Sequence, residues 1–178
     1  MDSCAGLSDA FGKFEHFGVF VCCMNAQHKT IEAFRELVLS THYDSFSVQD
    51  IVRRAGIARS TFYAHFRDKD HLLTVSLRPI LEVLAQVVQG RGEADTVQTV
   101  MQHIWENRLL GRVFFQPPLV GRIARTLLSE LDDPHHAAAV FRLHGTLGLL
   151  GNWCEGRVHK SPAELTQFLL EQHAQSTG

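Results

Sequence analysis

The chain has 178 residues, of which 45% are hydrophobic and 20% are charged, and its formal net charge is −2. This length suits one domain, or two small ones that share a core, and the ordinary composition excludes a disordered chain, a collagen and a coiled-coil rod. No apolar run approaches the roughly 18 residues of a transmembrane helix, so we expect no membrane partner. The four cysteines contain no C-x-x-C pair, which favours a reducing compartment over a disulfide framework.

The charge is unevenly distributed along the chain. Residues 1–23 contain one Lys or Arg and three acids, residues 24–78 contain eight and six, and residues 79–178 contain eight and ten. Only the middle segment is therefore positive, and it is the part of the chain best suited to a polyanion.

The chain begins with a predicted tail and one helix. Residues 1–23 show no helical period and no capping residue, so we expect them to be loosely ordered. Apolar residues recur at helical spacing from Ile31 to Val38, which predicts a helix over residues 27–41, followed by a short turn at residues 43–46.

Two short helices follow. Ser47, with Asp50 three residues later, has the form of a capping box, and Gly56 ends the helix that begins there. A second short helix is predicted over residues 58–65, with Phe62 and Phe66 on its buried side. Two short helices that are joined by a glycine-containing turn and preceded by a third describe a helix-turn-helix unit, here at residues 47–66.

The remainder of the chain also has a helical period. Asp68 caps a long apolar helix over residues 68–89, and Pro79 inside this helix predicts a kink or a break. Asp133 and Ser161 are each followed by proline, which is typical of a helix start. No strand-like alternation is present, and the fold is predicted to be all-α. The helices expected after residue 92 cover residues 94–110, 118–131, 134–155 and 162–175.

The second short helix of the unit is the one that would enter the major groove of DNA. Its periodicity places Arg59, Ser60, Thr61 and Tyr63 on the outward face and His65 at the boundary. Two alternatives stay open at this point, because Tyr63 also suits a core aromatic residue and His65 a packed or capping histidine.

The stretch over residues 46–73, FSVQDIVRRAGIARSTFYAHFRDKDHLL, closely resembles the DNA-binding domain of TetR-family transcriptional repressors. The resemblance covers about residues 27–75 and rests on the long ordered pattern A-G-I-x-R-S-T-F-Y-x-H-F-x-D-K-x-x-L-L, which is far more specific than a three-residue motif. A weaker likeness to the last two helices of the family lies in residues 151–165. Ala58 departs from the family, which often has Ser or Thr capping the recognition helix.

The resemblance implies a three-helix DNA-binding head at residues 24–84 and, at residues 85–178, a helical bundle for ligand sensing and dimerisation. Its partners would be double-stranded DNA with a palindromic operator, a second copy of the chain and an unidentified small-molecule effector.

Arg59 is the expected base contact, because a guanidinium pairs bidentately with guanine. Thr61 is expected to reach a thymine methyl or a phosphate, and Tyr63 a phosphate. The full set expected to contact DNA is Ser47, Arg59, Ser60, Thr61, Tyr63, His65 and Lys69. Lys69 would add a point charge at a helix N-terminus, although the plain reading of such a lysine is a solvated helix start.

The C-terminal half offers candidates for an effector pocket and for a metal site. The aromatic residues Trp105, Phe114, Phe115, Phe141 and Trp153 suit a pocket lining, but by default such residues form core. The histidines of this half and Cys154 lack the i, i+4 spacing of metal ligands, so we expect no metal and no cofactor.

The function predicted from the sequence is that of a cytoplasmic, sequence-specific DNA-binding regulator, a repressor whose operator binding an effector relieves. No catalytic fingerprint is present, and we expect no enzyme activity. The alternatives are a helical protein-interaction module that has lost DNA binding, a small helical enzyme and a metal sensor. The operator, the effector, the regulated genes and the choice between repression and activation are not encoded in any motif.

Overall fold

The computed structural model describes residues 21–174 of the chain, and all regular structure within these residues is helical, as predicted. Residues 1–20 of the expected N-terminal tail lie outside the described residues, whereas residues 21–23 already belong to the first described helix, which begins earlier than predicted. The elements are α2 (Val21–Ser40), η2 (Tyr43–Ser45, a 3₁₀ helix), α3 (Val48–Ala55), α4 (Arg59–His65), α5 (Lys69–Val88), α6 (Ala94–Glu106), α7 (Arg108–Phe114), α8 (Leu119–Glu130), α9 (Ala137–Cys154) and α10 (Pro162–Ala174).

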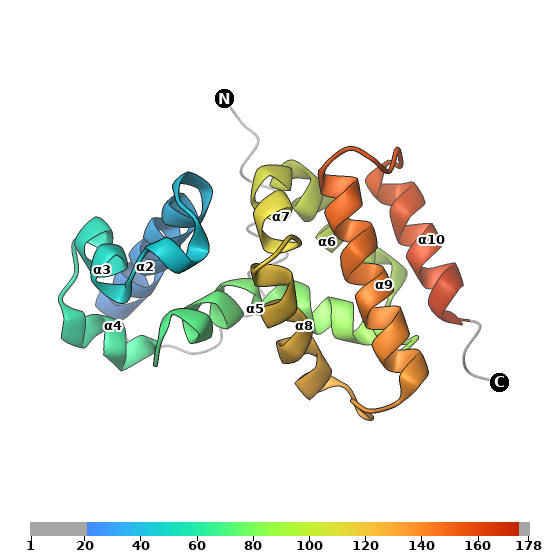
Figure 1. Cartoon of the computed structure of the whole chain (residues 1–178), viewed down its shortest axis with the longest axis horizontal. Helices are drawn as coiled ribbons and strands as arrows, with labels where there is room; N and C mark the ends of the chain where they lie inside the picture. Colours follow the sequence, from blue (N-terminus) through green and yellow to red (C-terminus); the bar gives the residue numbers. More distant parts are fainter. Residues whose placement is uncertain (1–20, 175–178) are drawn as a thin grey trace.

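The helices form two groups that α5 connects. Helices α2, α3 and α4 lie together at one end of the molecule, and α6 to α10 form a larger group at the other end (Figure 1). We call these the head and the bundle. Helix α5 starts beside the head and runs into the bundle, where it packs against α6, α8, α9 and α10.

Three helix starts have the capping contacts that the sequence predicted. The Ser47 Oγ atom accepts a bond from the backbone of Asp50, whose carboxylate accepts the backbone N–H of Ser47 at 2.8 Å. Asp68 accepts the backbone N–H of His71 at 2.7 Å at the start of α5. Ser161 and its partner three residues on form the same reciprocal pair at α10. These contacts satisfy N–H groups that no helical carbonyl can reach.

Two further helix boundaries differ from the prediction. The single helix expected over residues 94–110 is divided at Asn107, whose side-chain amide donates to the His103 carbonyl at 3.0 Å and so competes with helix continuation. Helix α9 begins at Ala137 instead of residue 134. The Asp133 carboxylate accepts the backbone N–H of His135 at 3.1 Å, which makes a local turn rather than a helix cap.

Of the two outcomes predicted at Pro79, a kink or a break, the break does not occur, because α5 is one α-helix from Lys69 to Val88. A proline in a helix costs about 3 kcal/mol through the lost hydrogen bond and the ring clash. The nine buried residues of α5 offset this cost by removing apolar surface from water. Helix α5 is also long and apolar enough to cross a membrane, but its buried residues make it the central core helix of this protein.

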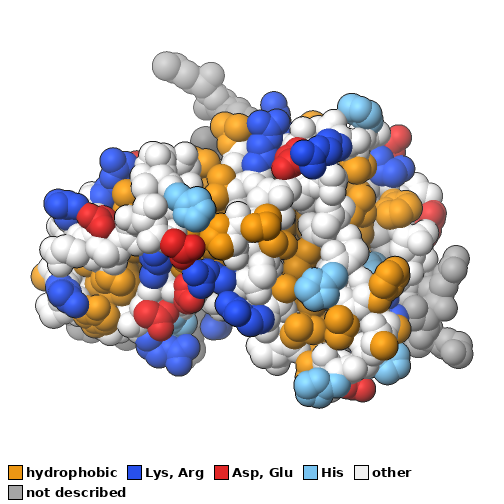
Figure 2. Space-filling model, in the orientation of Figure 1, with side chains coloured by type: hydrophobic (Ala, Val, Ile, Leu, Met, Phe, Trp, Pro, Cys, Tyr) orange, Lys and Arg blue, Asp and Glu red, His pale blue; other side chains and the backbone are white. Residues whose placement is uncertain are grey.

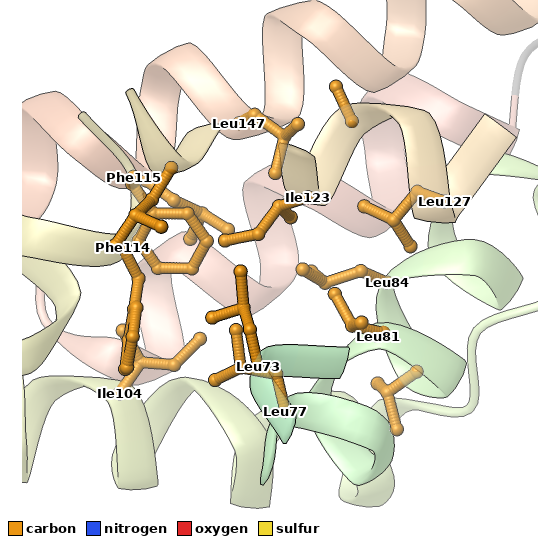
Figure 3. Packing of buried hydrophobic residues seen from close by; sticks show 14 of the residues in the cluster. Leu73, Leu77, Leu81, Leu84, Ile104, Phe114, Phe115, Ile123, Leu127 and Leu147 are labelled. Atoms are coloured by element: carbon orange, nitrogen blue, oxygen red, sulfur yellow. The ribbon is translucent and has the colours of Figure 1, made fainter. Parts of the chain in front are cut away.

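The core of the bundle forms around α5. Leucines from one face of α5 meet side chains from α6, the α7 end, α8 and α9 in a continuous cluster (Figure 3). The labelled members of the cluster are Leu73, Leu77, Leu81, Leu84, Ile104, Phe114, Phe115, Ile123, Leu127 and Leu147.

Close packing of α7 on α9 generates one stability prediction. A Cβ atom added at Gly111 would lie 2.6 Å from the Sγ atom of Cys154, which is buried. We expect Gly111→Ala to lower the free energy of unfolding by about 1–3 kcal/mol through overpacking, measured by urea denaturation. The penalty should shrink when Cys154 is replaced by alanine as well. The matched control is Gly121→Ala on α8, where the added Cβ meets nothing within 4 Å and stability should rise by up to about 1 kcal/mol. Equal effects of the two alanines would contradict this account.

Candidate nucleic-acid interface

The head contains two short helices whose inner faces are apolar. Helix α3 buries Ile51 and Val52, and α4 buries Phe62, which lies 5.4 Å from Phe66 between ring centroids. Gly56 between the helices has φ +63°, a left-handed conformation that costs other residues more than glycine. The predicted helix-turn-helix is therefore formed, and its buried side determines which side chains of α4 point outward.

The outward face of α4 carries a paired arginine and tyrosine. Tyr63 is 46% exposed, which excludes the core role that the sequence left open. The guanidinium carbon of Arg59 lies 5.4 Å from the centre of the Tyr63 ring, and its Nη2 atom donates to the Tyr63 hydroxyl at 3.3 Å. Ser60 is exposed beside them. The aromatic ring thus holds the guanidinium over the exposed surface of the helix.

The other residues expected to contact DNA lie at the edges of this face. Thr61 and His65 are half-buried, and the His65 ring packs beside Phe66 with 6.2 Å between centroids. Ser47 is exposed, but its hydroxyl donates to the Asp50 carboxylate at 2.7 Å. The bonds from Ser47 lower the pKa of the Asp50 carboxyl, so this cap is charged at neutral pH.

Lys69 is directed into the head. Its Nζ atom donates to the carbonyl oxygens of Tyr43 and Phe46, each at 2.7 Å, and lies 4.2 Å and 4.6 Å from the centres of their rings. Burial lowers the pKa of Lys69. The side chain holds η2 and the residue that follows it, a role that no sequence pattern indicated. A phosphate contact by Lys69 stays a prediction.

The basic residues of α3 have acidic partners. Arg53 pairs with Asp50 of the same helix, and Arg54 contacts Glu36 of α2 at 2.9 Å. Such exposed pairs contribute little to stability, and a phosphate can replace the carboxylate as the partner of either arginine.

An arginine far away in the sequence also reaches the head. Arg122 of α8 contacts Asp44 at 2.8 Å and Asp70 at 3.4 Å, and its guanidinium carbon lies 5.0 Å from the centre of the Tyr43 ring. The hydrogen bond to Asp44 raises the pKa of Arg122 further above its ordinary value. No local sequence signal marks Arg122, because its acidic partners are separated from it by 52 and 78 residues.

The five aromatic residues expected in an effector pocket fall into three positions. Phe114, Phe115 and Trp153 are buried in the bundle core, and Trp105 stacks on Trp153 with 5.0 Å between centroids. Phe141 is 79% exposed on α9. A hollow of about 400 Å³ lies on the head, away from all five, and is lined by Leu37, Thr41, Ser45, Phe46, Asp50, Arg53 and Arg54.

The candidate metal ligands of the C-terminal half do not converge. Within residues 21–174, no three His, Cys, Asp or Glu side chains come together in a way that would hold a metal ion. Burial raises the pKa of the Cys154 thiol to about 11, so this thiol is protonated at neutral pH and is a poor ligand and nucleophile.

Comparison with known proteins agrees with this geometry. A family model described as bacterial regulatory proteins of the tetR family matches residues 31–74, from α2 into α5. The head, over residues 31–74, is thus similar to the DNA-binding domain of the tetR family. The matched family is one of DNA-binding transcriptional regulators, and its helix-turn-helix corresponds to α3 and α4 of this chain.

Two solved structures are similar to this chain over most of its length. A TetR transcriptional regulator from Streptococcus agalactiae 2603V is 21% identical with a TM-score of 0.52, over 85% of this chain and 94% of that one. A structure described as the dihydroxyacetone kinase operon activator DhaS is 19% identical with a TM-score of 0.44, over 84% of this chain and 85% of that one. The first likeness extends the TetR fold from the head to the bundle.

The geometry at Lys69 generates a test that separates a structural role from DNA contact. Lys69→Met removes two hydrogen bonds to carbonyl groups and should lower the free energy of unfolding by about 1–2 kcal/mol in urea denaturation. The control Arg67→Met, on an exposed neighbour, should change it by less than about 0.5 kcal/mol. Unchanged stability, together with a salt slope of DNA binding reduced by about one, would instead identify Lys69 as a phosphate contact.

Proposed function

We propose that this protein is a TetR-family regulator, a cytoplasmic homodimeric repressor that binds a palindromic operator and is released from it by a small-molecule effector. The observation that carries the DNA-reading part of the proposal is the exposed pair of Arg59 and Tyr63 on α4. Both residues lie on the helix that enters the major groove in a helix-turn-helix protein.

Arg59 is the proposed base reader, because its guanidinium presents two donors that match guanine O6 and N7. Tyr63 is proposed to bind phosphate through its hydroxyl and to orient Arg59 through its ring. Ser47, Ser60 and Thr61 are proposed as further phosphate or base-edge contacts, and His65 as a minor contact from the edge of the face.

The proposed division places the DNA-binding domain at residues 24–84 and the regulatory domain at residues 85–178. Helix α5 contributes to both, since its first turn holds η2 through Lys69 and its later turns carry the bundle core. A change in the bundle can therefore reach the head without a flexible linker.

We propose that two copies of the chain associate through one face of α9. Phe141 on this helix is the most exposed of the large hydrophobic side chains among the described residues. A Cβ atom added at Gly145 or Gly148 would meet nothing within 4 Å, so these positions leave room for a close approach by a second helix. An isologous contact of this kind would give the two-fold symmetry that a palindromic operator requires.

Release by an effector is proposed to be a population shift. An effector that binds more tightly when the two heads are wrongly spaced lowers operator affinity by its differential affinity for that state. Trp105, Phe114, Phe115 and Trp153 are the proposed surroundings of the effector. Phe141, the fifth aromatic residue predicted for this pocket, is proposed to lie at the dimer contact instead.

The role of Arg59 is tested on operator DNA obtained by selection from random sequences. Arg59→Ala should cost about 1–3 kcal/mol of binding free energy on the selected site and should relax specificity at one base position. Arg59→Lys keeps the charge but loses the bidentate geometry, so it should retain the salt slope and lose the discrimination. Tyr63→Phe keeps the ring and should weaken binding to all sequences alike.

A selection that enriches no sequence would overturn the DNA-reading role and favour the helical interaction module. A symmetric enriched site supports the homodimer as well as DNA binding.

The dimer face is tested by the pair Phe141→Asp and Leu109→Asp, which introduce the same charge at two exposed positions on α9 and α7. We expect Phe141→Asp to shift the chain to monomers in analytical ultracentrifugation at micromolar concentration, since an unpaired buried charge costs several kcal/mol. Leu109→Asp, at a side chain 63% exposed, should leave the dimer intact. Dimers of unchanged stability in both variants would place the contact elsewhere.

A further inference from the structure

The junction between head and bundle contains a small network of charges around Arg122. Arg122 contacts two carboxylates of the head side, Asp44 in η2 and Asp70 in the first turn of α5. The hydroxyl of Tyr43 donates to the second carboxylate at 2.5 Å, and burial together with this bond raises the pKa of Tyr43, which keeps it protonated. Figure 2 shows acidic and basic side chains gathered on the surface where the head meets the bundle.

This network differs from the other ion pairs of residues 21–174. The remaining pairs lie within the head, within the bundle or within one helix and its cap, whereas Arg122 joins α8 of the bundle to Asp44 in η2 of the head and to Asp70 in the first turn of α5. Arg122 is also more shielded than its partners, with 27% of its side chain exposed against 52% for Asp44 and 56% for Asp70. Shielding and two acidic partners make these contacts stronger than an isolated surface pair.

The position of η2 matters for DNA reading. The Tyr43 ring packs against Phe34 and Phe46 at 6.2 and 5.7 Å, and Ser47, the cap of α3, follows directly. A shift of η2 therefore carries the start of the helix-turn-helix with it. On the bundle side of the network, Arg122 belongs to α8, and the next residue of this helix, Ile123, is part of the bundle core.

We propose that Arg122 is a positioning residue that sets the orientation of the DNA-binding head on the bundle and, in the dimer, the spacing of the two heads. This inference rests on the proposed homodimer and palindromic operator, and it names the contact through which α8 acts on operator binding. Movement of α8 would break or remake two ion pairs and one cation–π contact at once. The orientation of the head would therefore respond to a change in the position of α8 within the bundle.

The test compares Arg122→Gln with the matched control Arg125→Gln, an exposed arginine one turn further along α8. Both variants are measured on the selected operator and on versions with one base pair added or removed between the half-sites. Arg122→Gln should bind the optimal spacing about 3- to 10-fold more weakly, while its preference for that spacing over the altered ones falls toward unity. Arg125→Gln should keep the wild-type preference.

A purely structural role would give a different pattern. Arg122→Gln would then weaken binding at all spacings by the same factor, in step with a lower melting temperature, and this outcome would overturn the proposal. Under the proposal, the double variant Asp44→Asn and Asp70→Asn should lose part of the spacing preference. The same two changes should have no further effect when they are added to Arg122→Gln. Arg122→Lys should retain more of the preference than Arg122→Gln.

A measurement without DNA separates failure of this inference from failure of the proposed function. Spin labels on non-natural amino acids at Gln49 of α3 and Gln167 of α10, both exposed, report the distance between head and bundle. The distance distribution should broaden in Arg122→Gln and not in Arg125→Gln. An unchanged distance distribution in Arg122→Gln overturns the positioning role. If the distribution broadens but the wild-type chain shows no spacing preference on DNA, the positioning role of Arg122 is supported and the palindromic operator is overturned.

Discussion

The structure depends on helix α5, which both contacts the head and forms the centre of the bundle core. Its first turn makes polar contacts with the head, through Lys69 to two carbonyl groups and through Asp70 to Tyr43. From Leu73 onward its apolar side chains form the centre of the bundle core. Burial of these side chains maintains the helix across Pro79, because the apolar surface removed from water outweighs one missing hydrogen bond. The head is therefore mounted on a rigid element of the bundle.

Charge pairing inside the head leaves fewer unpaired cationic side chains on its outward face than the composition indicates. Lys69 is directed inward, and Arg53 and Arg54 have carboxylate partners. Arg59 is instead exposed and lies over the Tyr63 ring, with its Nη2 atom donating to the Tyr63 hydroxyl. Few unpaired cations limit the general attraction of this face to phosphate, so in the proposed function a few placed groups would carry recognition of base edges.

Arg122 connects the bundle to the head through its contacts with Asp44 and Asp70. The strength of its contacts comes from shielding and from the number of partners, since single exposed ion pairs contribute little. Its acidic partners lie in η2 and at the start of α5, the two elements that frame the helix-turn-helix. The orientation of the head thus depends on residues that belong to neither short helix of the DNA-reading unit.

The sequence by itself determined the features that arise from local physics. The cap at Ser47, the helix end at Gly56 and the apolar period of α4 each require only neighbouring residues, and all three were predicted. Only the tertiary structure decided the continuity of α5 through Pro79, the inward direction of Lys69 and the reach of Arg122 to the head. Each of these depends on free energy from groups distant in the chain, by burial against other helices or by charges brought together on folding, and no local pattern contains that information.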